Sequence, residues 1–273
     1  MSVRGVAATR PLISLLTDFG LVDPFVAEMK AVILSICPHA RIIDVSHEVD
    51  RFSVGMGAFL LAEAAPSFPE CSVHVAVVDP GVGGSRRAIV IKTRRSIYVG
   101  PDNGLLIPAA QSDGLLAVFE ITNRSMMRRD ISPTFHGRDI FAPAAAHLAC
   151  GQSPEACGPE IADYTKSPYR EPIMKGKTVS CEILHVDRFG NIATNLQQKM
   201  LSRYDFDLGE RIVLSVGSRK FSARLVRTFS DLREGEVGAL FGSHGFLEIV
   251  SREKSASEKL RVTRGIVVRM HLA

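Results

Sequence analysis

The chain has no tryptophan, few aromatic residues and no large excess of either charge. Of its 273 residues 7% are aromatic, and 33 Lys+Arg against 29 Asp+Glu leave a formal net charge of +4. This surplus excludes a strong overall attraction to nucleic acid but leaves room for a local basic patch. With 46% hydrophobic and 23% charged residues, the composition excludes a collagen, a disordered chain and a disulfide-stapled miniprotein. The length fits one large domain or two modest ones.

Cysteine is also scarce, and its pattern excludes the common cysteine frameworks. The number is odd, no two form a C-x-x-C pair and no spacing matches a zinc module, for the set Cys37, Cys71, Cys150, Cys157 and Cys181. We expect each to pack as a small hydrophobe in a reducing compartment. No run of ~18 uncharged apolar residues occurs, and residues 1–12 lack the apolar core of a signal peptide. The sequence therefore predicts a soluble cytoplasmic protein without membrane partners.

The first half alternates buried strands with helices. Strands are predicted at Leu12–Leu16, Ile42–Val45 and Val73–Val78, and helices at Phe25–Ile36 and Val54–Ala65. This alternation predicts βαβ units and a parallel sheet. A hairpin (AIVIKT and SIYVG) and a helix (FAPAAAHLA) follow. We therefore predict an N-terminal α/β domain over residues 1–165 with a mainly parallel central sheet.

The second half has a different pattern. Periodicity fails over Asp163–Lys177, where Pro, Lys and Gly cluster, and we interpret this segment as an inter-domain linker. Short alternating strands follow without a convincing helix of 12 residues. The pattern predicts a C-terminal domain over residues 178–273 that is a small β-barrel or a sandwich.

Polar loops follow several of the predicted strands, where ligands bind at a parallel sheet. Asp18 follows the first strand, with Asp23 close behind. Asp18 suits a pair of sugar hydroxyls, and a helix N-cap is the alternative for either residue. Asp79 ends the third strand, and Arg86 follows seven residues later across three glycines that permit close approach to a ligand. An exposed salt bridge in a turn is the alternative here.

Further loops carry weaker signals. Gly100–Gly104 (GPDNG) is typical of a tight turn. His136 lies beside Arg138 and Asp139, just before a helix of small residues, and a lone histidine in such a place is often structural. Residues 187–191 (DRFGN) offer Phe189 for stacking and Asn191 for an adenine edge, or form a simple hairpin turn. No two histidines have the spacing of a metal site, so we expect no catalytic metal.

Taken together, these segments resemble one known family. The series TDFG, DPFVAEMKAVILSICP, DVSHEV, VVDPGVGGSRR, YVGPDNGLL, TFHGRDIFAPAAAHLA, DRFGNIATNL and GSHGFLEI is similar to the S-adenosyl-L-methionine hydrolase (hydroxide adenosyltransferase) family. Fluorinases and chlorinases are its halide-using relatives. The resemblance runs from about Leu12 to about Ile249, and its motifs agree in order and spacing. It departs from the family after FLEI, where this chain reads VSREK.

The resemblance implies a fold, an assembly and a set of site residues. It implies an N-terminal α/β domain, a C-terminal β-barrel and a homotrimer that binds its ligand between domains of adjacent subunits. By position, the catalytic set falls on Asp79, Arg86 and His136. In the substrate-binding set, a ribose-binding carboxylate falls on Asp18, and two carboxylates near the methionine end fall on Asp23 and Asp187. The two adenine-side residues fall on Phe189 and Asn191, and two further contacts fall on Ser243 and His244.

The chemistry of the implied substrate is compatible with this small set of groups. A sulfonium leaves as a neutral thioether, so the leaving group requires neither a general acid nor a metal, and we expect no cofactor. An in-line water near the ribose 5′ carbon is required, which Asp79 would orient or deprotonate. A carboxylate there disfavours a halide. The expectation is hydrolysis of S-adenosyl-L-methionine to adenosine and L-methionine. The alternatives are a non-catalytic adenosine or S-adenosyl-L-methionine binding protein and an adenosyl halide synthase.

Overall fold

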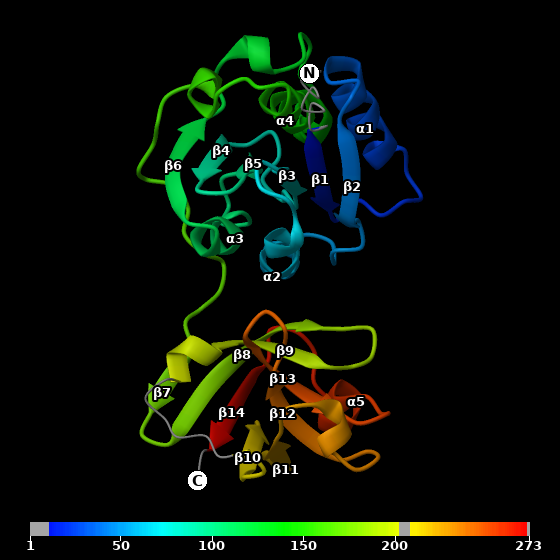
Figure 1. The fold of residues 1–273 in the computed structure, drawn as a ribbon, viewed down its shortest axis with the longest axis vertical. Coiled ribbons are helices and arrows are strands. Elements are labelled where there is room, and N and C mark those ends of the chain that lie inside the picture. Colours follow the sequence, from blue (N-terminus) through cyan, green and yellow to red (C-terminus); the bar gives the residue numbers. More distant parts are fainter. Residues whose placement is uncertain (1–10, 202–207, 272–273) are drawn as a thin grey trace, which may run out of the picture. The chain divides into compact units, whose positions relative to one another are not determined.

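The chain forms two compact units, seen here in a computed structural model that describes residues 11–201 and 208–271. One unit comprises Met1–Pro168 and the other Tyr169–Ala273 (Figure 1). The boundary falls within the proline- and lysine-rich segment Asp163–Lys177. Over the described residues, no helix is both long and apolar enough to cross a membrane.

The first unit is built on a six-stranded sheet with the strand order β2-β1-β3-β5-β4-β6. β1, β2, β3 and β5 are mutually parallel, and β4 runs antiparallel to both β5 and β6. The expected mainly parallel sheet and the β4–β5 hairpin are therefore both confirmed. The strands are β1 (Leu12–Thr17), β2 (Arg41–Ser46), β3 (Val73–Val77), β4 (Ala88–Thr93), β5 (Ile97–Pro101) and β6 (Leu115–Glu120).

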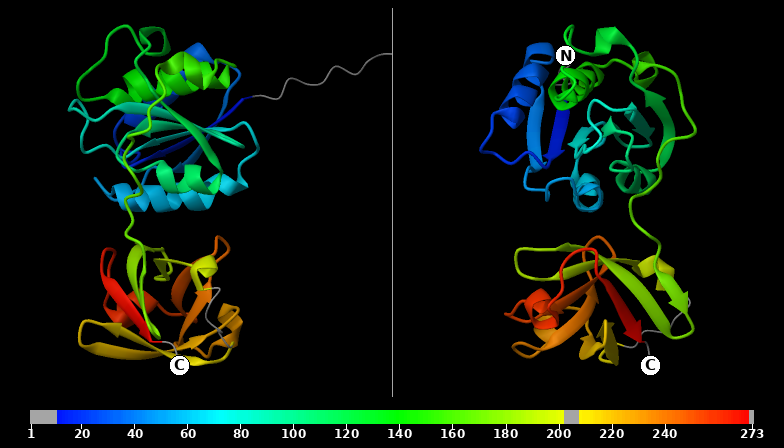
Figure 2. Two further views of the ribbon diagram at one scale, coloured as in Figure 1. Left: turned by 90° about the vertical axis from the view of Figure 1, so that its left-hand side faces the viewer. Right: turned by 180° about the vertical axis from the view of Figure 1, so that it is seen from behind.

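Helices cover both faces of this sheet, which gives a three-layer α/β/α unit (Figure 2). α1 and α4 pack together on one face, and α2 and α3 pack together on the other. α1 has the predicted bounds because its apolar residues recur at helical spacing and bury Val26, Met29 and Ile33. The bounds are α1 (Phe25–Ile36), α2 (Val54–Ala64), α3 (Ile107–Ser112) and α4 (Ala142–Ala149).

The sheet order creates a switch point between β1 and β3. From β1 the chain passes to β2 on one side and then crosses to β3 on the other side. Open α/β sheets bind ligands outside the carboxyl ends of the strands at such a point. The loops after β1 and β3 carry Asp18 and Asp79. The topology therefore favours a ligand site at these two loops.

The second unit is a closed barrel. Its strands follow the order β14-β10-β11-β12-β13-β9-β8-β7, and an additional β14–β8 pairing joins the sheet into a ring of seven strands with β7 outside it. Of the two architectures compatible with the strand pattern, the barrel is therefore confirmed. The elements are β7 (Ile173–Lys175), β8 (Thr178–Val186), β9 (Ile192–Gln197), β10 (Arg211–Val216), β11 (Arg219–Leu225), β12 (Val237–Phe241), β13 (Phe246–Ser251), α5 (Ala256–Leu260) and β14 (Val267–His271).

Candidate active site

Arg86 joins the two other members of a cluster at the carboxyl end of β3. Its Nε donates to both carboxylate oxygens of Asp79 at 3.0 Å, and its Nη2 also donates to Oδ2. The same Nη2 lies 2.8 Å from His136 Nδ1. The Asp79 and Arg86 side chains are 5% and 11% exposed, so this is not the exposed turn salt bridge that the sequence also allowed. The structure thus brings together Asp79, Arg86 and His136, which we call the Asp79 cluster.

The arginine determines the protonation state of the histidine. A guanidinium N–H can only donate, so His136 Nδ1 must accept, and the neutral ring carries its proton on Nε2. Burial lowers the pKa of His136, and the adjacent Arg86 cation lowers it further. The cluster therefore offers a carboxylate acceptor and a neutral imidazole Nε2–H donor side by side.

A π-helical turn packs against the Asp79 cluster. Residues Gly137–Phe141 form this turn directly after His136 and before α4. Phe141 is fully buried, and the Arg86 guanidinium carbon lies 5.2 Å above its ring centre. This cation–π contact adds to the ion pair in holding the guanidinium plane. Extra helical residues of this kind are often found at functional sites.

The loop after β1 lies against the loop that carries His136. Phe19, Phe25 and Phe135 form a triangle of edge-to-face contacts, with ring centres 5.3–5.9 Å apart. Phe19 follows Asp18 in sequence, and Phe135 precedes His136. The aromatic cluster therefore couples the two loops, and the sequence pattern does not reveal this contact because Phe135 is far along the chain from Phe19 and Phe25.

Asp18 and Asp23 have different surroundings on this edge. Asp18 is half-buried, and its Oδ2 accepts from the backbone N of Phe52 at 2.9 Å. Phe52 is a non-glycine residue at a positive φ of 65° and is 71% exposed, so the carboxylate holds a strained turn. Asp23 is exposed, and α1 has no side-chain cap, so neither residue is an N-cap for this helix.

The loop at Asp102 is structural, as the turn interpretation expected. Asp102 accepts from Arg87 Nη2 at 2.8 Å and from the backbone N of Thr165 at 2.8 Å. Asn103 Nδ2 donates to the carbonyl of Val78 at 2.8 Å. The loop therefore ties Thr165, near the end of the first unit, to the backbone of Val78 at the end of β3.

The second unit contributes a separate set of predicted residues. In the turn 187–191, Asp187 Oδ1 accepts from the backbone N of Phe189 at 2.9 Å and of Asn191 at 2.8 Å, and Oδ2 accepts from Asn191 Nδ2 at 2.9 Å. The Asp187 carboxylate thus orients the Asn191 amide. Phe189 is 78% exposed, which leaves its ring faces accessible. We call these five residues the Asp187 turn.

A cavity of about 850 Å³ adjoins the Asp187 turn. Three predicted residues line it, together with others that the sequence analysis did not select, namely Phe229, Ser230, Glu248, Ser251, Arg252, Glu253, Lys254 and Ser255. Gly190, at a φ of +84°, lets the turn pack on Ser255, where a Cβ would lie 2.2 Å from the hydroxyl. The segment VSREK, where the chain departs from the family that it resembles, therefore contributes to one wall. Ser243 and His244, 3.2 Å apart through Oγ and Nδ1, are exposed and do not line this cavity.

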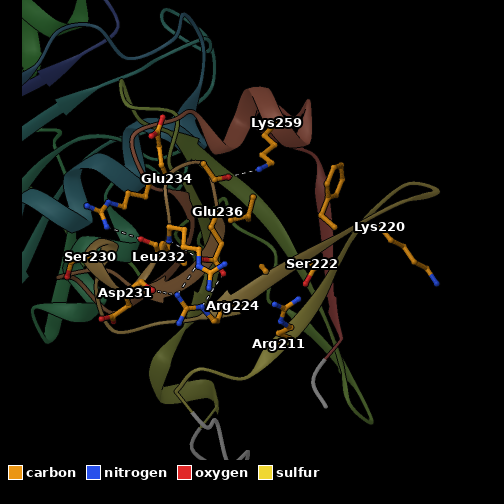
Figure 3. Close-up of a pocket in the computed structure, with 16 residues that line it drawn as sticks. Arg211, Lys220, Ser222, Arg224, Ser230, Asp231, Leu232, Glu234, Glu236 and Lys259 are labelled. Atoms are coloured by element: carbon orange, nitrogen blue, oxygen red, sulfur yellow. Dashed lines mark hydrogen bonds and ion pairs between the residues drawn. The ribbon is translucent and has the colours of Figure 1, made fainter.

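A second cavity of about 1180 Å³ lies beside the loop between β11 and β12 and is rich in arginine and lysine (Figure 3). Several of its cations already hold the chain: Arg224 binds Glu236, Arg252 donates to the Leu232 carbonyl and Lys259 to the Gly235 carbonyl. Figure 3 shows Lys220 extending away from Arg224. These charges brace the loop rather than converge on one point.

The described residues contain no cluster of potential metal ligands. Across residues 11–201 and 208–271, no three His, Cys, Asp or Glu side chains gather as a metal ion would require. The five cysteines are all free, and burial raises the pKa of Cys157 and Cys181 to about 12. These two thiols are therefore inert packing groups near neutral pH.

Comparison with known proteins identifies the family that the loop motifs resemble, with one domain model for each unit. Residues 13–158 match the N-terminal domain model of the SAM hydroxide adenosyltransferases, and residues 181–269 match the C-terminal domain model of the same family. The chain belongs to this family. A protein of Salinispora tropica named (R)-S-adenosyl-L-methionine hydrolase is 40% identical, over 94% of this chain and 97% of that one.

Two further relatives are similar to this chain over nearly its whole length. The crystal structure of an uncharacterized conserved protein from Thermotoga maritima is 39% identical, with a TM-score of 0.90 over 95% of this chain and 99% of that one. A protein of Nocardia brasiliensis named fluorinase is 26% identical, over 96% of this chain and 97% of that one. The chain thus has higher identity to the relative named as a hydrolase than to the one named as a fluorinase.

Proposed function

We propose that the protein is an enzyme that hydrolyses S-adenosyl-L-methionine to adenosine and L-methionine. The observation that supports this most directly is the Asp79 cluster, in which one arginine binds both the carboxylate and the histidine. In the reaction, a water oxygen bonds to the ribose 5′ carbon while the C5′–S bond breaks. The bonding electron pair stays on sulfur and gives the neutral thioether of methionine. The proton lost by water passes to solvent.

The roles of the three catalytic residues follow from their hydrogen-bonding capacities. Asp79 accepts a hydrogen bond from the attacking water, and the His136 Nε2–H donates to the water oxygen, so the two groups together fix its position. Because both Asp79 carboxylate oxygens already accept hydrogen bonds from Arg86, we assign Asp79 to orienting the water rather than to removing its proton. The thioether leaves uncharged, so this chemistry calls for neither a metal nor a cofactor.

The substrate is held by residues of both units in this proposal. Asp18 binds the ribose hydroxyls, and Asp23 and Asp187 lie near the cationic methionine end. Phe189 stacks on adenine, and Asn191 pairs with its edge. The support for the last two roles is the Asp187 turn, in which a carboxylate orients the amide next to an exposed ring. Ser243 and His244 supply further contacts.

We also propose a cytoplasmic homotrimer in which each site draws on two neighbouring subunits. The two residue sets lie on separate compact units, which suits a site completed by assembly. The five free cysteines suit a reducing compartment. Nucleic acid and membranes have no role in this proposal.

The test is turnover of pure protein in H₂¹⁸O, followed by chromatography and mass spectrometry. We expect adenosine labelled with ¹⁸O at the 5′ hydroxyl and unlabelled methionine. Asp79→Asn should lower kcat by about 10² or more, since orientation and general-base effects of this size are typical. Asp163→Asn is the matched control, because Asp163 pairs with the neighbouring Arg87 but is 81% exposed.

Three results would overturn the proposal. Tight binding of substrate without turnover would favour a binding protein. A 5′-halo-adenosine formed in preference to adenosine on adding chloride or fluoride would favour a halide synthase. Label in methionine instead of adenosine would exclude attack at the 5′ carbon.

A further inference from the structure

Beyond the Asp79 cluster, the first unit contains an ion network built around one fully buried carboxylate. Asp139 is the third residue after His136 and is 0% exposed. Its Oδ1 accepts from Arg138 Nε at 2.7 Å and Arg128 Nη1 at 3.0 Å. Its Oδ2 accepts from Arg138 Nη2 at 3.0 Å and from the backbone N of Ser132 at 2.9 Å. A buried carboxylate is retained at such a position only when its oxygens are satisfied, as they are here.

These bonds close the loop that carries His136. The Ser132 contact joins the two ends of the segment 132–139, and the backbone N of Arg128 also donates to the Asp139 carbonyl at 2.9 Å. His136 lies inside this closed segment. The carboxylate therefore fixes both ends of the loop around the histidine without contacting its ring.

The network also fixes the loop to α1. Arg138 Nη1 donates to Glu28 Oε2 on α1 at 2.7 Å, and the Arg138 guanidinium lies 4.9 Å from the ring centre of Phe135. Glu28 belongs to the first turn of the helix that follows the Asp18 loop. Arg138 thus anchors the residue before His136 to a rigid element.

We propose that Asp139 is a positioning residue for His136, acting through the closure of loop 132–139 to hold the imidazole against Arg86. This inference rests on the proposed function only where it speaks of rate. Loss of the closure would let His136 Nδ1 leave Arg86 Nη2, from which it lies 2.8 Å away. The Nε2–H donor would then no longer be fixed. A misplacement of about 1 Å can lower a rate by about 10².

The experiment compares Asp139→Asn with Asp130→Asn, an exposed aspartate two residues before the loop 132–139. Asparagine turns an N–H₂ group toward donors that need an acceptor. We expect kcat for S-adenosyl-L-methionine to fall by about 10-fold or more with KM within about threefold. The ¹⁵N signals of His136, assigned with His136→Gln, should change from a single Nε2–H tautomer to a mixture. Asp130→Asn should match the wild type in both measurements.

Each outcome decides the proposal. A wild-type kcat or an unchanged His136 tautomer in Asp139→Asn would overturn it, because a purely structural role would not alter the tautomer. Should Asp139→Asn fail to fold, Arg128→Gln removes one donor from a side chain that is 44% exposed, and the same readouts apply. If the wild type shows no turnover, the proposed function fails while the ¹⁵N comparison still decides the role of Asp139.

Discussion

Arg86 is the residue on which the chemistry of the Asp79 cluster depends. Its guanidinium binds a carboxylate and a histidine at once, and the histidine can only accept from it. A protonated His136 would have no lone pair for that bond and would place two cations in contact. The cluster is therefore intact only while His136 is neutral.

This dependence predicts the acid side of the pH–rate profile. Burial and the Arg86 cation lower the pKa of His136 below its ordinary 6.5, so the neutral form persists below pH 6.5. We expect kcat/KM to fall toward acid pH with a midpoint below pH 6.5, as His136 becomes protonated. A midpoint at or above pH 6.5 would contradict this.

Two variants assign that limb to His136. His136→Gln should be slower and should lose the acid limb, since its amide does not titrate. His39→Gln, at an exposed histidine outside the cluster, should keep the wild-type profile.

At the scale of elements, the glycine-rich loop is shaped by a close approach to the His136 loop. Gly83 has a φ of +74°, and a Cβ there would lie 2.3 Å from the carbonyl oxygen of Pro133. No contact this short occurs in folded proteins without a shift of one partner. Glycine at this position lets the loop that carries Arg86 reach the loop that carries His136.

Gly83→Ala should therefore separate the two loops and lower kcat by about 10-fold or more, because reacting groups move by about 1 Å. The positive φ alone costs an alanine about 1–2 kcal/mol. Gly151→Ala is the control, since Gly151 has a φ of +95° but no atom within 4 Å of its Cβ. If both variants lose the same stability and neither loses activity, the loop contact has no role in catalysis.

The sequence was sufficient for elements whose signal is local and long. The apolar spacing of Phe25–Ile36 predicts α1 with the bounds that it has. α3 and β6 were not predicted, because α3 spans fewer than two helical turns and β6 buries only Val118 and Phe119, so neither has the apolar pattern of the predicted elements. The π-helical turn was also missed, since its extra residue is stabilised by the buried Asp139 and Phe141 and leaves no local pattern.

The candidate site likewise combines a local contact, which the sequence can predict, with a long-range contact, which it cannot. Asp79 and Arg86 are seven residues apart, and their pairing follows from a turn, whereas Arg86 and His136 are 50 residues apart and meet only through the sheet. Asp79 and Asp102 both follow buried strands, and the sequence separates them only by the tight-turn pattern of residues 100–104. Their partners distinguish them, because Asp102 binds the backbone of Thr165 while Asp79 binds the arginine that reaches His136.

At the scale of the whole molecule, the residues of the candidate site belong to two units with separate cores. The proposed trimer therefore makes a prediction that a monomer does not. Co-expressed Asp79→Asn and Asn191→Ala subunits carry their lesions in different units. If each site combines units of two neighbouring subunits, about one of the three sites in every mixed trimer is free of both lesions.

We expect such mixtures to regain about a third of wild-type turnover, measured after purification through two affinity tags that retain only mixed trimers. The control mixes Asp79→Asn with His136→Asn, which both lie in the first unit, so that every site keeps one lesion. Equal activity in the two mixtures would exclude a site shared between subunits. Light scattering on the same samples gives the number of subunits.

The closure of the barrel has a consequence for how the protein is made. β14 pairs with β8, so the ring of strands is completed by one of the last segments of the described chain. The sheet of the first unit, by contrast, is complete once β6 has emerged from the ribosome. During synthesis the first unit can fold before the barrel is complete, and until β14 emerges β8 lacks a partner strand on one side. Translation that stalls before Val267 would leave that edge open to other chains, which makes the final strand the point at which nascent molecules are protected from aggregation.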